Sequence, residues 1–228
     1  MGIFRSFFVV CLLILPVWAH QLWMEEEKGC LVLNYGHIHP SGHETEKIQY
    51  TPDSIKKAIC YKNGSFSDIK VEKTPLIVKN NCSVVFVQFS TGYWTKTVEG
   101  TVHLPKHRAV NPVYSWLSIE NLVFIKKWEQ AAFDTRFEGL VILPLKDPLK
   151  LKEGDKVRLV VLLNGRPVSD VPVAYDGKIR GATDENGRIN IRIKHPGLQM
   201  IEASIRQKLN SNRADYVVYS STLNFEVK

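Results

Sequence analysis

The chain lacks the local signatures of several large enzyme classes. No Gly-x-Ser-x-Gly elbow, phosphate-binding loop or dinucleotide fingerprint occurs in its 228 residues, so no hydrolase arrangement or nucleotide site is indicated. Lysines and arginines are spread along the chain and form no cluster, which leaves nucleic-acid binding with little support. We therefore expect a protein that is not an enzyme and does not bind nucleic acid.

Long hydrophobic runs are also absent, apart from one at the start. Residues 7–15 form an apolar stretch that follows Arg5 and precedes Val17-Trp18-Ala19, an arrangement typical of a secretory signal peptide. The alternative is a retained membrane anchor, but the run is well short of the ~20 residues that cross a bilayer. We expect a signal peptide over residues 1–19 and a soluble, periplasmic product.

The mature chain would be basic. Cleavage removes Arg5, so the formal net charge of +7 would fall by one, to +6. A basic secreted protein can contact an anionic membrane surface. The simpler interpretation is a solvated basic surface.

Cysteine is scarce after cleavage, because only Cys30, Cys60 and Cys82 remain. An oxidising compartment permits disulfides, and an odd number leaves one thiol over. Cys60 and Cys82 lie in neighbouring strand-like runs and are the preferred pair. Cys30 would then be a free thiol, either buried or a soft metal ligand.

What the chain does contain is a series of short β-branched and aromatic runs, which predicts an all-β fold. We expect an N-terminal β domain over residues 20–110. Residues 139–228 carry six strand candidates and an Asn164-Gly165 hairpin signal, which predicts an immunoglobulin-like antiparallel sandwich. Trp128, Ala131 and Ala132 recur at helical spacing, so a short helix over about 119–133 is expected within a helical connector, 111–138.

Histidines are concentrated near the start of the mature chain. His37 and His39 are two residues apart at the end of a predicted strand, so both rings would lie on one face. His43 follows across a turn, and His103 is a further candidate. Neutral imidazole suits nickel, copper, zinc and iron. The alternative is a flexible histidine-rich loop that binds metal weakly.

His20 differs in kind, because cleavage after residue 19 would make it the first residue. Its α-amino nitrogen and its ring could then chelate one metal ion. The alternative is a disordered terminus. The apolar Leu22-Trp23-Met24 run argues against disorder, since it would fix the terminus.

Several motifs together resemble a bacterial family of periplasmic proteins linked to nickel and cobalt uptake. They occur in order over nearly the whole mature chain: Ala19-His20-x-Leu22-Trp23, Tyr35-Gly36-His37, Gly92-Tyr93-Trp94-Thr95-Lys96-Thr97, Lys127-Trp128-Glu129, Leu143-Pro144-Leu145-Lys146-Asp147-Pro148, Leu151-Lys152-x-Gly154-Asp155, Thr183-Asp184-x-x-Gly187-Arg188 and Thr222-Leu223-x-Phe225. The resemblance implies an N-terminal metal region and a C-terminal sandwich. Of the candidate ligands, His20 and His37 match its motifs, whereas His39 and His43 do not.

The leading hypothesis is a periplasmic protein that captures Ni²⁺ or Co²⁺ for a membrane uptake transporter. Its expected ligands are His20, His37, His39, His43 and His103. One alternative is a copper enzyme with an N-terminal histidine brace, because copper binds nitrogen sites more tightly than nickel. Another is a structural envelope module in which the histidines are incidental.

Overall fold

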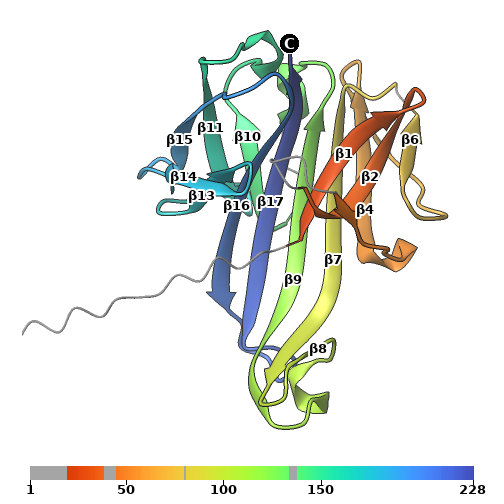
Figure 1. Ribbon diagram of the computed structural model, residues 1–228, viewed down its shortest axis with the longest axis vertical. Coiled ribbons are helices and arrows are strands. Elements are labelled where there is room, and N and C mark those ends of the chain that lie inside the picture. Colours follow the sequence, from red (N-terminus) through yellow and green to blue (C-terminus); the bar gives the residue numbers. More distant parts are fainter. Residues whose placement is uncertain (1–19, 39–44, 80, 134–137) are drawn as a thin grey trace, which may run out of the picture.

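A computed structural model describes residues 20–38, 45–79, 81–133 and 138–228, and nearly all of its regular structure is β-strand (Figure 1). The strands are β1 Gln21–Glu27, β2 Cys30–His37, β3 Glu46–Lys47, β4 Ile55–Lys62, β5 Ser65–Asp68, β6 Ile77–Lys79, β7 Val84–Thr97, β8 Thr101–Val102, β9 Pro112–Ile125, β10 Leu140–Pro144, β11 Lys156–Leu163, β12 Arg166–Pro167, β13 Pro172–Tyr175, β14 Lys178–Ala182, β15 Arg188–Arg192, β16 Gly197–Lys208 and β17 Tyr216–Val227. Four 3-10 helices join them, at Pro52–Ser54, Lys106–Arg108, Gln130–Phe133 and Pro148–Lys150. The expectation of an all-β protein is confirmed.

A nine-stranded sheet forms the centre of the molecule. Its strand order is β14-β13-β16-β17-β9-β7-β4-β5, with β8 beside β7. The pair β9–β17 is parallel, and the other pairs of this sheet are antiparallel. Strands from both predicted domains therefore share one hydrogen-bonded sheet.

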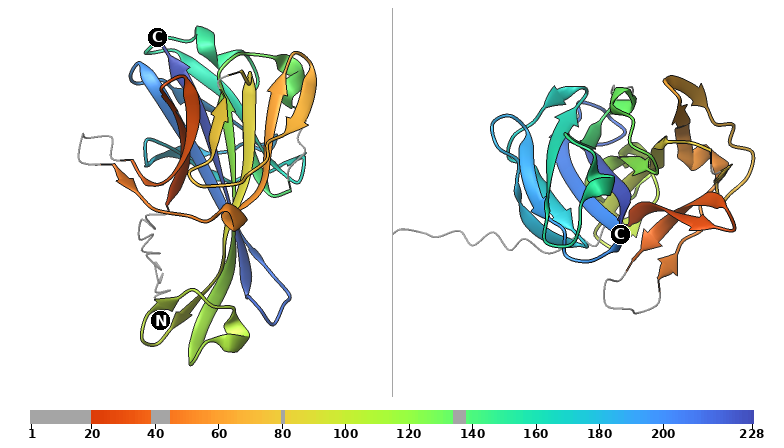
Figure 2. Two further views of the ribbon diagram at one scale, coloured as in Figure 1. Left: turned by 90° about the vertical axis from the view of Figure 1, so that its right-hand side faces the viewer. Right: turned by 90° about the horizontal axis from the view of Figure 1, so that it is seen from above.

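Two smaller sheets cover the two faces of this central sheet. One consists of β1, β2, β3 and β6, and the other of β10, β11, β12 and β15. Side chains alternate along each central strand, so Leu122 and Phe124 of β9 belong to the core under the first small sheet. Val123 and Ile125 belong to the core under the second. Figure 2 shows both small sheets from above, and the facing antiparallel sheets at the C-terminal end form the expected sandwich.

The helix expected over about 119–133 does not form. Residues up to Ile125 belong to β9, and only the 3-10 helix Gln130–Phe133 follows. The run from Leu122 to Ile125 is buried on every side chain, because both faces of β9 are covered. Such a run shows no alternation and cannot be told from a buried helix by its pattern alone. Half of the predicted helical connector, 111–138, belongs to the central strand β9.

The preferred disulfide is confirmed. Cys60 of β4 is bonded to Cys82, just before β7, across strands that are neighbours in the central sheet. Cys30 is the free cysteine of the described part of the chain. Within those same residues, no helix is long and apolar enough to cross a membrane.

Candidate functional site

The β1–β2 hairpin brings two predicted site residues together at its open end. Its register pairs Gln21 with Gly36 and Leu22 with Tyr35, so His20 and His37 come next, opposite each other. Their ring centroids are 4.7 Å apart, at an interplanar angle of 47°. His20 is exposed and His37 is half-buried. One imidazole from just before β1 and one from the end of β2 therefore meet at the rim of the small sheet.

Tyr35 lies beside His20. It was not among the predicted site residues. Its hydroxyl oxygen and the Nδ1 of His20 are hydrogen-bonded at 3.0 Å. The Tyr35 ring is buried against Phe89 of the central sheet, with centroids 4.9 Å apart. The signal for Tyr35 was its position two residues before His37, which places both side chains on one face of β2.

The electrostatic surroundings favour a neutral ring at His20. Burial and the neighbouring His37 ring lower the pKa of His20, and Glu46 opposes them. Burial, aided by the charge of Glu120 and opposed by a hydrogen bond from Thr91, raises the pKa of Tyr35. Neutral imidazole is the form of histidine that binds metal ions.

Among the described residues, the remaining predicted ligand, His103, is not grouped with His20 and His37. His39 and His43 lie outside the described residues. His103 packs its ring on Trp94, with centroids 4.6 Å apart, and its Nε2 contacts the carbonyl oxygen of Thr91. Across residues 20–38, 45–79, 81–133 and 138–228, no three His, Cys, Asp or Glu side chains are grouped closely enough to hold a metal ion.

The sequence profile of a family described as "Domain of unknown function (DUF4198)" matches residues 17–207. The chain belongs to the DUF4198 family. This match includes the β1–β2 hairpin and most of the central sheet, and the family description assigns no function.

Other comparisons add little to the DUF4198 assignment. A search of curated protein sequences found no match. A matching solved structure is "Crystal structure of Dscam1 isoform 9.44, N-terminal four Ig domains", at 10% identity and a TM-score of 0.22. The match covers 82% of this chain and 39% of the Dscam1 chain. A structural similarity this low supports no conclusion about this chain.

Two carboxyl groups that were not among the predicted site residues, those of Glu120 and Glu202, lie inside the region that matches DUF4198. Burial raises the pKa of Glu120 in β9 to about 7; a hydrogen bond from Ser118 opposes this shift, and the charge of Glu202 adds to it. Burial likewise raises the pKa of Glu202 in β16 to about 7, opposed by a hydrogen bond from Gln21. The Oε1 atom of Glu202 is buried with no hydrogen-bond partner among the described residues. Glu120 was missed because its segment was assigned to a helix.

Proposed function

We propose that this protein binds a transition metal ion through His20 and His37 in the periplasm and delivers it to a membrane uptake transporter. Ni²⁺ or Co²⁺ is the cargo we favour. The observation that carries the proposal is the pair of imidazole rings, 4.7 Å apart between centroids, at the open end of the first hairpin. The resemblance to nickel- and cobalt-linked periplasmic proteins supports the choice of cargo.

The donor chemistry fits such an ion. A free amino group at His20, together with its Nδ1, would close a six-membered chelate ring on one metal ion. That nitrogen lies 3.0 Å from the hydroxyl oxygen of Tyr35, so a metal ion bound at Nδ1 would replace this hydrogen bond and have the Tyr35 oxygen beside it. His37 would add a second imidazole from the neighbouring strand, and imidazole nitrogen suits the later divalent transition metals.

The position at a rim fits transfer of cargo. His20 is exposed and His37 is half-buried, so ligands of a partner protein could reach the same ion and compete for it. A site closed on all sides would retain its metal. The partner that we propose is a membrane transporter, and the protein itself would carry out no catalytic step.

A copper-dependent oxidative enzyme is the second candidate, and one observation favours it. The Tyr35 hydroxyl lies beside the same His20 nitrogen that an N-terminal brace would use. Copper also binds nitrogen ligands more tightly than nickel does. Oxidation of ascorbate with release of peroxide by the copper-loaded protein would support this candidate over cargo transfer.

Metal titration by calorimetry tests the proposed site. We expect protein that begins at His20, verified by mass spectrometry, to bind one equivalent of Ni²⁺ or Co²⁺. One extra N-terminal glycine should weaken binding about tenfold or more, because it removes the terminal chelate. His37→Ala should weaken it by a similar factor. His107→Ala is the matched control, since His107 is exposed in a different part of the fold.

Two results would contradict the site. Equal affinity in all four proteins would show that neither His20 nor His37 holds the ion. Absence of stoichiometric binding to Ni²⁺, Co²⁺ and Cu²⁺ would leave the envelope-module hypothesis.

A further inference from the structure

The long central strands extend past the two small sheets at one end of the molecule. Figure 1 shows the ends of β7, β9, β16 and β17 projecting there together with β8, and the side view in Figure 2 shows the same projection. We call this part the tip and define it as residues 96–114 and 206–216. It lies outside the proposed metal site.

Specific hydrogen bonds hold the two segments of the tip together. Asp215 accepts hydrogen bonds from the backbone N–H and the hydroxyl of Ser115, each at 2.9 Å. Lys106 pairs with the carboxylate of Asp215, and its backbone N–H donates to the carbonyl of Arg213 at 2.8 Å. The surface of the tip is therefore fixed in the fold before any partner binds.

Apolar side chains are exposed at the tip far more than elsewhere. The described residues contain seven exposed large hydrophobic side chains, and five of them are here: Val98 at 77%, Val110 at 76%, Val113 at 59%, Tyr114 at 38% and Leu104 at 36%. Single exposed apolar residues need no explanation, but a group of them marks an interaction surface.

The same part of the chain carries more than half of the net positive charge. Six cationic side chains lie in the tip against two carboxylates, Glu99 and Asp215, so four of the seven net positive charges are here. The six are Lys96, Lys106, Arg108, Arg206, Lys208 and Arg213. Lys106 is paired with Asp215, and four of the other cationic residues are exposed: Arg108, Arg206, Lys208 and Arg213.

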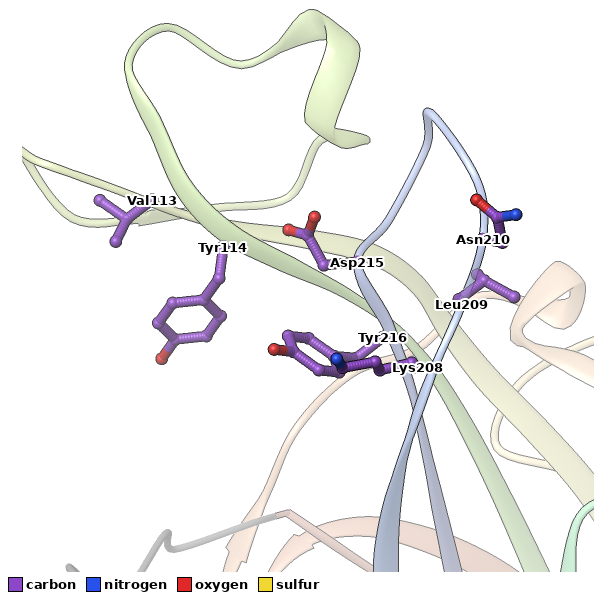
Figure 3. Close-up of a pocket in the computed structure, with 7 residues that line it drawn as sticks. All are labelled: Val113, Tyr114, Lys208, Leu209, Asn210, Asp215 and Tyr216. Carbon is purple, nitrogen blue, oxygen red and sulfur yellow. The ribbon is translucent and has the colours of Figure 1, made fainter.

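Aromatic rings hold two of these cations in place. The guanidinium of Arg206 lies 5.2 Å from the ring centroid of Tyr216 and 5.9 Å from that of Tyr114. The guanidinium of Arg213 lies 4.4 Å from the centroid of Tyr93. Figure 3 shows Tyr114 and Tyr216 projecting from neighbouring strands to the same side of a groove that Lys208 also lines.

We propose that the tip binds the surface of an anionic phospholipid bilayer. Exposed valines would enter the boundary between headgroups and acyl chains, as the apolar face of a peripheral membrane protein does. Lysine and arginine side chains are attracted to anionic lipid, each contributing favourably near the surface. Tyrosine and tryptophan prefer the level of the headgroups. The groove between Tyr114 and Tyr216 would hold one lipid headgroup.

This surface fits a membrane better than a folded protein partner. Four of its five exposed apolar side chains are aliphatic and lie on loops or at a strand end, and the net charge around them is positive. Contact with anionic lipid requires only exposed apolar side chains surrounded by positive charge. Membrane binding by the tip is independent of whether the first hairpin binds a metal ion.

Sedimentation with lipid vesicles tests the proposal on the mature protein. We expect binding to vesicles that contain about one third phosphatidylglycerol, weaker binding to pure phosphatidylcholine, and loss of binding as salt rises. The double substitution Val98→Asp and Val110→Asp should weaken binding about tenfold or more, because it removes apolar contact and adds repulsion. Ile179→Asp is the matched control, since Ile179 is 64% exposed on β14.

Three outcomes would overturn the proposal. The first is absence of binding to both kinds of vesicle. The second is equal binding of the double variant and the unsubstituted protein, with circular dichroism showing that both are folded. The third is an equal loss in Ile179→Asp, which would mean that surface charge alone decides binding.

Discussion

Substitution Gly36→Ala is expected to separate β3 from β2 and to lower the free energy of unfolding by about 3 kcal/mol. Gly36 has φ +148°, and a Cβ there would collide with the carbonyl oxygen of Glu46 and lie 2.9 Å from its carbonyl carbon. Those atoms are backbone and cannot rotate away. The pairing between β2 and β3 is short, since it consists of Gly36 with Lys47 and His37 with Glu46. We therefore expect β3 to detach before the β1–β2 hairpin opens.

Gly29→Ala is the matched control, because it lies at the closed end of the same hairpin. Its φ is also positive, +76°, but no heavy atom would lie within 4 Å of an added Cβ. Gly29→Ala should lower the free energy of unfolding by about 1 kcal/mol, from backbone strain alone. Urea denaturation measures the free energy of unfolding of both variants. An equal decrease in the two would contradict the predicted collision at Gly36. If His37 binds metal, Gly36→Ala should also weaken Ni²⁺ binding about tenfold while Gly29→Ala leaves it unchanged.

Glu120→Gln is expected to stabilise the protein at pH 8 and to have little effect at pH 5. The folded-state pKa of Glu120 is raised to about 7, chiefly by burial. Between about pH 4.5 and 7 the unfolded chain loses this proton while the folded protein keeps it. Stability therefore falls as pH rises through that window, by up to roughly 3 kcal/mol for this one carboxyl group. Glutamine stays neutral at both pH values.

The gain at pH 8 should be smaller than that limit, about 1–2 kcal/mol, because the new amide N–H₂ is buried and needs acceptors. The hydroxyl of Ser118 donates to Oε1 of Glu120 at 3.1 Å, and glutamine can keep that bond. Glu202 and Tyr35 are the other titratable groups near this carboxyl group.

Thermal unfolding at pH 5, 6.5 and 8 would measure the difference. Glu226→Gln, on an exposed position of β17, removes the same charge from the surface and serves as the control. An equal melting-temperature shift at all three pH values would show that the Glu120 carboxyl group is not the source of the pH dependence.

Both residues of the proposed metal pair could be found from the chain alone, but their proximity could not. His20 stood out because a cleavage site precedes it, and His37 because it ends a strand-like run. Their meeting depends on the β1–β2 register, which pairs Gln21 with Gly36. The bond between Tyr35 and His20 follows from the same register, so this bond could not be read from local sequence.

Local sequence was sufficient to predict the β character of the chain, the Cys60–Cys82 bond and the turn at Asn164-Gly165, where Asn164 has φ 51°. Each depends on local chemistry or on strands that are close in the chain. The fold was needed to establish the parallel pairing of β9 with β17, the burial of Glu120 and the formation of the tip from two distant segments. The physical reason is that strand partners are selected by burial on both faces. A chain segment covered on both faces loses the alternation from which its neighbours could be inferred.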